Sequence, residues 1–202
     1  DTFKLKVGRG TVEEQVERIR RVHEVLPREA ALRLDANRSW SLQTAREIAR
    51  WLGDFRPAYM EEPLADAVQL RDFHEATGWP LALDESLQGL KPDEALPDIK
   101  GVVAWVFKPT LMQKLADVLE WQARAHRAKI AAVISSSYES GVGIRMLAEI
   151  ASRDPLCAAG LDTYRFLAED VLEPRLDFDA GRIELHDART LAVQTSRLKR
   201  VA

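Results

Sequence analysis

The sequence predicts an α/β fold in which parallel strands alternate with helices in the manner of a (β/α)₈ barrel. Two observations predict this fold class. Short apolar runs recur along the chain with an amphipathic helical pattern in most of the gaps, and a polar or ionisable residue lies at or next to the end of each of the first six runs. Such alternation is typical of the β-α-β unit, whose strands pair in parallel.

Seven runs have the length and composition of buried strands. They lie at Phe3–Val7, Ala31–Asp35, Ala58–Glu61, Leu81–Asp84, Val102–Lys108, Ile130–Ser136 and Ala158–Leu161. A complete barrel has eight strands, so this chain is one strand short. The alternative is the open doubly wound sheet of a dinucleotide-binding protein. We prefer the barrel because residues 7–11 hold only two glycines, at the wrong spacing for a phosphate-binding turn.

Helices are predicted in the gaps between these runs. The clearest comes after the first run, where Thr11 and Glu14 have the spacing of a capping box. Apolar residues then recur on one helical face, at Val12, Val16, Ile19 and Leu26. Two further helices should end at Gly53 and Gly78, because glycine is a preferred C-terminal cap. Others are expected at about residues 111–128 and 143–153.

The pattern changes after Glu173. Residues 176–185 predict a hairpin that turns at Ala180 and Gly181, and then a loosely structured tail. We therefore divide the chain into a partial barrel domain at residues 1–175 and a C-terminal hairpin and tail at residues 176–202. The chain begins almost directly in a strand pattern, and we expect it to be a fragment.

Composition excludes several functional classes. The 29 basic and 32 acidic side chains give a net charge of −3, and no concentrated run of Lys and Arg predicts nucleic-acid binding. The single Cys157 forms no internal disulfide, and the longest apolar stretch, Val102–Phe107, is too short to cross a membrane. We expect a cytoplasmic protein without a nucleic-acid or membrane partner.

The polar or ionisable residues at or next to the ends of the runs are the candidate functional residues. They are separated by 23 to 29 positions, at Lys6, Asp35, Glu61, Asp84, Lys108 and Ser135. A βα unit spans about 30 residues or fewer, so each residue falls at the carboxyl end of a consecutive strand. Charged residues commonly end strands, which is the ordinary explanation for any one of them. Six such residues at corresponding places on consecutive strands favour a shared site at the barrel mouth.

Asp35, Glu61 and Asp84 would present three carboxylates to one point. Oxygen ligands without a neighbouring His or Cys favour a hard cation, so we predict Mg²⁺, with Mn²⁺ as a possible substitute. A cation would also keep the three groups ionised despite their mutual repulsion. The alternative is that they form salt bridges with Lys6 and Lys108.

Lys4 and Lys6 are one residue apart in a strand and point to the same face, which in a barrel is the interior. A neighbouring cation, a nearby Mg²⁺ and partial desolvation would disfavour a protonated Lys6, which suits a general base. Lys108 lies four strands further on. Two lysines around a divalent metal suit the removal of a proton from the carbon beside a carboxylate.

Two polar turns are candidate anion sites. Residues 135–143 and 160–163 each come after a predicted strand and offer hydroxyl groups and backbone N–H groups. The remaining candidates for chemistry are assigned to surface or packing roles: His23, His74, His126, His186 and Cys157.

Together these motifs resemble the muconate-lactonizing subgroup of the enolase superfamily. The resemblance covers residues 3 to about 170 and rests on Lys4–Lys6, Leu34–Asn37, Glu61–Pro63, Leu83–Ser86, Lys108–Leu111 and Ser135–Ser140. Within the subgroup, Arg33–Arg38, Val133–Ser137 and Gly160–Thr163 are similar to the o-succinylbenzoate synthase family of menaquinone biosynthesis. The implied fold is a (β/α)₇β-type TIM barrel, here without its first strand and the N-terminal α+β capping domain. Met112 and Gln113 depart from the Thr-Gly or Gly-Gly that relatives often carry.

The resemblance implies a role for each candidate. Asp35, Glu61 and Asp84 would be the Mg²⁺ ligands, Lys6 the base, and Lys108 the cation that faces an enediolate intermediate. The implied substrate contacts are Lys4, Asn37, Ser135 and Gly160. The implied reaction is the dehydration of a small-molecule carboxylate, 2-succinyl-6-hydroxy-2,4-cyclohexadiene-1-carboxylate, to o-succinylbenzoate.

Three alternatives stay open on the sequence. An N-succinylamino acid racemase would use the same metal and two lysines. A Schiff-base aldolase would use Lys108, although it has no need of three carboxylates. A non-catalytic scaffold would keep the fold without the reaction.

Overall fold

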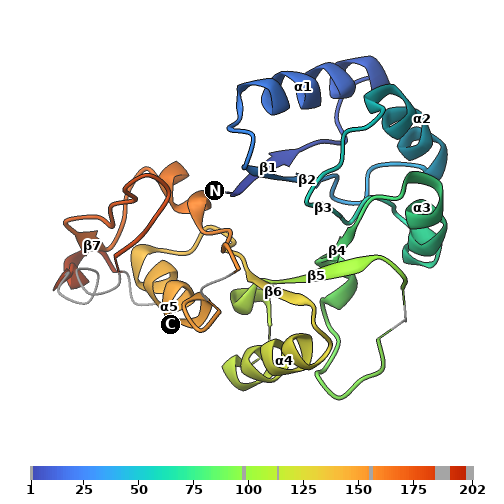
Figure 1. Cartoon of the computed structure of the whole chain (residues 1–202). Coiled ribbons are helices and arrows are strands. Elements are labelled where there is room, and N and C mark those ends of the chain that lie inside the picture. The colour runs from blue at the N-terminus through green and yellow to red at the C-terminus, as the bar shows by residue number, and fades with distance from the viewer. Residues whose placement is uncertain (1, 97–98, 113, 155–156, 185–191, 199–202) are drawn as a thin grey trace. The chain divides into compact units, whose positions relative to one another are not determined.

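The computed structural model describes residues 2–96, 99–112, 114–154, 157–184 and 192–198. The chain divides into two compact units, which are described separately. Unit 1 comprises residues 1–106 and 121–131, and unit 2 comprises residues 107–120 and 132–202. The strands of the main sheet are arranged in chain order, β1-β2-β3-β4-β5-β6 (Figure 1).

Unit 1 contains the strands that carry the predicted carboxylates. They are β1 (Thr2–Lys6), β2 (Ala31–Asp35), β3 (Tyr59–Glu61), β4 (Leu81–Leu83) and β5 (Val102–Phe107), and each neighbouring pair is parallel. The register places Lys6 opposite Asp35, and Asp35 opposite Glu61. The last residues of β1, β2 and β3 therefore form one row at the carboxyl edge of the sheet.

The helices of unit 1 begin and end largely where the sequence predicts. They are α1 (Val12–Val25), α2 (Leu42–Leu52) and α3 (Leu70–Thr77), with short 3₁₀ turns η1 (Ala67–Gln69) and η2 (Glu85–Leu87). Thr11 and Glu14 form the predicted capping box of α1. Gly53 and Gly78 are the C-caps of α2 and α3, both with positive φ.

The core of unit 1 is built from both helices and strands. Its fully buried apolar side chains include Ile19, Leu34, Ile48, Met60, Phe73, Trp79 and Leu81. Burying each such side chain contributes about 1.5–3 kcal/mol, so the row of polar strand ends lies above a stable apolar layer.

Unit 2 contains the second group of candidate residues. Its elements are η3 (Pro109–Leu111), α5 (Gly141–Ala151), η4 (Asp162–Phe166), η5 (Thr195–Arg197) and the antiparallel pair β7 (Leu172–Glu173) and β8 (Ala192–Val193). Most of β6 (Ala131–Ile134) and the start of α4 (Leu115–Arg127) also belong to it. Its buried cluster consists of Ile144, Tyr164, Leu172 and Leu176.

Two predictions of secondary structure need correction. The seventh predicted strand, residues 158–161, is reduced to a single bridge between Gly160 and Ser135. The chain cannot continue as a strand because Leu161, at φ −104° and ψ 2°, already leads into η4. The helix predicted from about residue 111 begins only at Leu115, and Leu111 is instead the last residue of η3.

The predicted C-terminal hairpin is confirmed in part. Asp179 and Arg182 form an antiparallel bridge around Ala180 and Gly181, both of which have positive φ. Leu185 and His186 lie outside the described residues, as does Gln113. Among the described residues, no helix is long and apolar enough to cross a membrane.

Candidate active site

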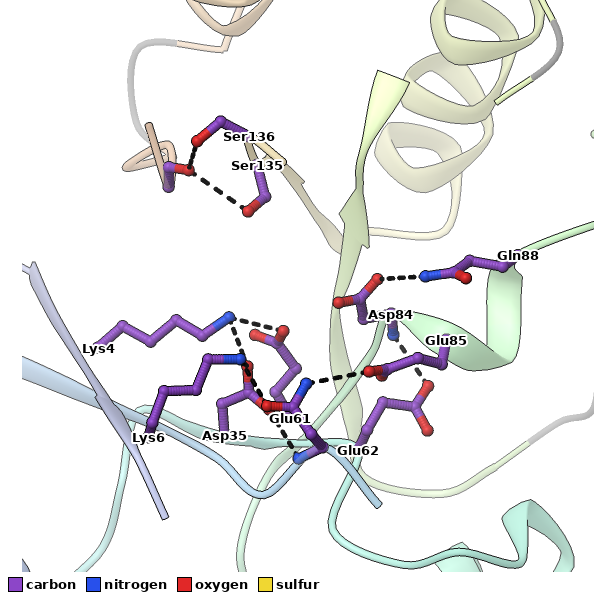
Figure 2. A network of polar contacts seen from close by, with 12 residues as sticks. Lys4, Lys6, Asp35, Glu61, Glu62, Asp84, Glu85, Gln88, Ser135 and Ser136 are labelled. Carbon is purple, nitrogen blue, oxygen red and sulfur yellow. Dashed lines mark hydrogen bonds and ion pairs between the residues drawn. The ribbon is translucent and has the colours of Figure 1, made fainter. Parts of the chain in front are cut away.

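A cluster of lysines and carboxylates lies at the carboxyl edge of β1, β2 and β3 (Figure 2). The Nζ atom of Lys4 is 2.8 Å from Oδ2 of Asp35 and 2.7 Å from Oε1 of Glu61. The Nζ atom of Lys6 is 2.6 Å from the same Oδ2 of Asp35. Because both lysines reach Asp35, the prediction that their side chains share one face is confirmed.

The exposure of the two lysines differs from the expectation of a buried pair. The side chain of Lys6 is 61% exposed, whereas that of Lys4 is 30% exposed. The parallel register explains this difference, because Lys6 is the last residue of β1 while Lys4 lies deeper in the sheet. Asp35, Glu61 and Asp84 are all buried.

Burial and charge shift the pKa values of three groups in this cluster. Desolvation, together with the charges of Asp35 and Asp84, raises the pKa of Glu61 to about 8, despite the opposing effect of Lys4. Desolvation also acts to raise the pKa of Asp35, but Lys4 and Lys6 outweigh it and hold that pKa well below its usual range. Desolvation acts to lower the pKa of Lys4, but its pairing with Glu61 and Asp35 raises it instead.

The donor chemistry of this cluster fits a hard divalent cation. Oε2 of Glu61 is buried and has no hydrogen-bond partner among the described residues. The charges of Asp35 and Asp84 also disfavour ionisation of Glu61. A cation would satisfy the orphan oxygen and relieve the repulsion, and all the available ligand atoms are oxygens.

The Lys4 ammonium offsets negative charge at Asp35 and Glu61, which a divalent cation would also do. Within the part of the chain that the structure describes, no three His, Cys, Asp or Glu side chains stand together as an assembled metal site. The Lys6–Asp35 ion pair corresponds to part of the predicted salt-bridge alternative, and Lys4 contacts Asp35 and Glu61 in addition. The role of Asp35, Glu61 and Asp84 as ligands of one ion stays a prediction.

Asn37 fixes the position of Lys6. Its Oδ1 atom accepts a hydrogen bond of 2.6 Å from Lys6 Nζ, and its backbone N–H donates to Oδ1 of Asp35 at 2.9 Å. On the other side its Nδ2 atom donates to Oε1 of Glu85 at 3.0 Å. Because Glu85 accepts from the amide nitrogen, the amide oxygen faces Lys6. Asn37, predicted as a substrate contact, is thus also a partner of the predicted base.

The candidate residues of unit 2 form a second group. Ser135 and Gly160 lie side by side, because they form a parallel bridge and Ser135 Oγ donates to Gly160 O at 3.3 Å. The hydroxyl of Ser136 donates to the same carbonyl at 3.1 Å and lies 2.6 Å from Thr163 Oγ1. A Cβ atom on Gly160 would stand 3.1 Å from Ser135 Oγ, so only glycine fits here without a shift. Lys108 is half-buried between β5 and η3.

Sequence reasoning missed two residues of the unit 1 network. Glu62 and Glu85 each come directly after a predicted ligand in the chain. Glu62 is fully buried, and Glu85 binds Asn37. The only sequence signal was that both lie inside the motifs Glu61–Pro63 and Leu83–Ser86, in which the preceding acid was taken as the functional residue.

Comparison with known proteins identifies the family to which this chain belongs. The model of the family described as "Enolase C-terminal domain-like" matches residues 1–196, and the chain belongs to that family. It is also similar to the o-succinylbenzoate synthases of Yersinia pestis (strain Pestoides F) and Yersinia pseudotuberculosis serotype IB (strain PB1/+). Each is 39% identical over 155 residues, covering 75% of this chain and 47% of the relative. The chain thus spans about half the length of these curated relatives.

Solved structures confirm the predicted fold class, an α/β barrel domain of the enolase superfamily. The dipeptide epimerase from Cytophaga hutchinsonii, complexed with Mg and the dipeptide D-Ala-L-Val, has a TM-score of 0.75 and 26% identity, covering 88% of this chain and 49% of that one. Muconate cycloisomerase from Pseudomonas fluorescens has a TM-score of 0.80 and 20% identity, covering 97% of this chain and 56% of that one.

Proposed function

We propose that this chain carries the active site of an o-succinylbenzoate synthase, a Mg²⁺-dependent lyase. The substrate would be 2-succinyl-6-hydroxy-2,4-cyclohexadiene-1-carboxylate, which loses water to become o-succinylbenzoate. The observation that carries the proposal is the contact of Lys4 and Lys6 with Asp35 and Glu61 at one sheet edge, in a chain 39% identical to proteins of that name.

Asp35, Glu61 and Asp84 would hold the metal. When bound, Mg²⁺ would polarise the substrate carboxylate and stabilise the negative charge that develops beside it. Mn²⁺ has the same preference for oxygen ligands and is expected to substitute.

Lys6 would act as the general base. Asp35 Oδ2 and Asn37 Oδ1, each 2.6 Å from its Nζ atom, hold the amine in one place. The neutral amine would take the proton from the carbon beside the carboxylate, leaving the electron pair of the C–H bond on the substrate as an enediolate. The same ammonium would then return a proton to the departing hydroxide, so that water leaves and the ring becomes aromatic.

The remaining candidates would bind the substrate. Lys4 and Lys108 would each offer a positive charge, Lys108 to the enediolate. Ser135 would contact the succinyl carboxylate through its hydroxyl, and Gly160, which has no side chain, would leave room for that group. Their proximity within unit 2 supports this assignment.

The second candidate is an N-succinylamino acid racemase. The likeness to a dipeptide epimerase favours it, because epimerising an amino acid also begins with loss of a proton beside a carbonyl group. The two activities share the metal and the base. They differ in the fate of the intermediate, which loses hydroxide in the synthase and regains a proton in the racemase.

One experiment separates the two. The purified protein with Mg²⁺ is mixed with each substrate, and ultraviolet absorbance records the aromatic product while NMR in D₂O records exchange of the α-proton. The synthase predicts o-succinylbenzoate formation that disappears in Lys6→Met. Exchange of the amino acid proton without an aromatic product would assign the racemase instead. If the folded protein catalyses neither reaction with Mg²⁺ present, the non-catalytic scaffold is the remaining alternative.

A further inference from the structure

Glu62 stands beside the proposed metal ligands but binds only protein. It comes directly after Glu61 at the end of β3, and Figure 2 shows the two side chains near each other. Glu62 is fully buried and has a φ of 37°. Four hydrogen bonds reach its two carboxylate oxygens, from Asp84 N, Ser86 N, Ser86 Oγ and Arg38 Nε. Since both oxygens are used, the carboxylate is a structural acceptor rather than a further metal ligand.

One oxygen of Glu62 holds the turn that carries Asp84. Its Oε1 atom accepts from the backbone N–H of Asp84 at 2.9 Å and from that of Ser86 at 2.7 Å. Asp84 has φ −126° and ψ −80°, which lies outside both the α and β regions. Hydrogen bonds to an ionised acceptor are about twice as strong as neutral ones, so they can stabilise a backbone that the local sequence does not favour.

The other oxygen of Glu62 holds the loop after β2. Its Oε2 atom accepts from Arg38 Nε at 3.1 Å and from Ser86 Oγ at 3.0 Å. The backbone N–H of Arg38 also donates to the carbonyl of Glu62 at 2.7 Å. A single buried side chain therefore links the chain segments that come after β2, β3 and β4.

We infer that Glu62 is a positioning residue for divalent-cation binding. Asp35, Glu61 and Asp84 lie at the ends of the three strands that Glu62 links. By fixing the Asp84 turn and the Arg38 loop, it holds the three carboxylates in register without contacting the ion. This inference rests on the proposed function, because it concerns the same ligands.

Mn²⁺ binding tests the inference without relying on catalysis. Free Mn²⁺ is counted by its paramagnetic resonance signal as the protein is titrated, for wild type, Glu62→Gln and Glu62→Ala. Loss of a group that orients metal ligands typically weakens binding about 10–100-fold. The loss of Mn²⁺ affinity in Glu62→Ala should fall in that range. Glu62→Gln should lose less, because its carbonyl oxygen still accepts from the Asp84 and Ser86 amides while its NH₂ group meets the Arg38 donor.

Asp170→Asn is the matched control. Asp170 is another buried carboxylate that accepts from a backbone N–H, that of Gly141 at 2.9 Å, but it belongs to unit 2. Its variant should lower the melting temperature yet bind Mn²⁺ like wild type. All titrations are made well below the lowest melting temperature.

The outcomes separate the inference from the proposed function. Wild-type binding that is weakened in Glu62→Gln but not in Asp170→Asn supports both. Equal affinity in wild type and the Glu62 variants, or equal weakening in Asp170→Asn, overturns the positioning role alone. No Mn²⁺ binding by folded wild type overturns the proposed function and the inference together. If Glu62→Ala does not fold, Glu62→Gln decides.

Discussion

Lys4 Nζ donates a hydrogen bond of 2.7 Å to Oε1 of Glu61, and the same ammonium lies 2.8 Å from Oδ2 of Asp35. One protein cation thus bridges two of the three proposed metal ligands. Metal binding is expected to change the surroundings of Lys4, since Mg²⁺ would take over part of its charge compensation.

Lys4→Met should destabilise the protein without metal by about 2 kcal/mol. This is less than the loss of a fully buried partner, because Lys6 still pairs with Asp35 and Lys4 is partly exposed. Saturating Mg²⁺ should restore more stability to this variant than to wild type. Urea unfolding with and without Mg²⁺ measures both effects, and Lys91→Met is the exposed control. An unchanged unfolding midpoint in metal-free Lys4→Met would contradict the bridging role.

Metal affinity should rise with pH up to about 8. The folded protein keeps a proton on Glu61 to about pH 8, whereas an ordinary Glu releases it near 4.5. Metal must displace that proton, so affinity should increase by up to about tenfold per pH unit below this value and level off above it. Titration calorimetry in buffers of different ionisation enthalpy counts the released proton. Equal affinity at pH 6 and pH 8 would show that Glu61 is already ionised.

The same shift predicts how stability without metal depends on pH. Between pH 4.5 and about 8, folding takes up a proton at Glu61, because the folded pKa is raised above the unfolded one. The contribution of Glu61 to stability therefore decreases as pH rises through this window. Asp35 has a lowered pKa, so its contribution is lost only in acid, below its ordinary value of 3.8. Urea unfolding of wild type and Glu61→Gln across pH 5–8 should show a steeper decline in wild type.

Asn37→Ala should lower kcat by about 10–100-fold, because Lys6 loses the acceptor that orients it. Mn²⁺ affinity should change far less, since the Asn37 side chain contacts Lys6 and Glu85 rather than a proposed ligand. Steady-state kinetics and Mn²⁺ titration on one preparation give both values. Gln43→Ala, on the exposed face of α2, is the control. A normal kcat in Asn37→Ala would remove the orienting role.

Gly8→Ala should destabilise the protein by at least about 2 kcal/mol. Gly8 has a φ of +88°, and an added Cβ atom would meet Ser39 Oγ at 1.9 Å and the Ala36 carbonyl at 2.9 Å. Gly78→Ala is the matched control, with a φ of +68° and open space around it, and should cost only about 1 kcal/mol. Urea unfolding measures the free energy of unfolding of both variants. Equal losses in Gly8→Ala and Gly78→Ala would show that the close approach of the loops after β1 and β2 does not contribute to the cost at Gly8.

The row of strand ends was predictable because it depends on spacing alone. Residues 23 to 29 apart on consecutive parallel strands must share a sheet edge, and Lys6, Asp35 and Glu61 do so in the observed register. The seventh strand was not predictable in this way. Leu161 is apolar, as a residue in a buried strand would be, but the chain turns into η4 directly after Gly160.

Side-chain contacts were less accessible to sequence reasoning. Alternation places Lys4 and Lys6 on one face, but the reach of each side chain depends on the depth of its neighbours. The alternation of side chains therefore could not predict that Lys4 would bridge Asp35 and Glu61. Glu62 was missed for a related reason. Its partners are backbone N–H groups after another strand, and no periodic pattern encodes them.

Anomalous scattering from crystals soaked in Mn²⁺ tests the central claim most directly. The account predicts one strong peak about 2.1 Å from carboxylate oxygens of Asp35, Glu61 and Asp84, with Lys4 no longer bridging the first two. A peak elsewhere, or an undisturbed Lys4 bridge at saturating Mn²⁺, would contradict it.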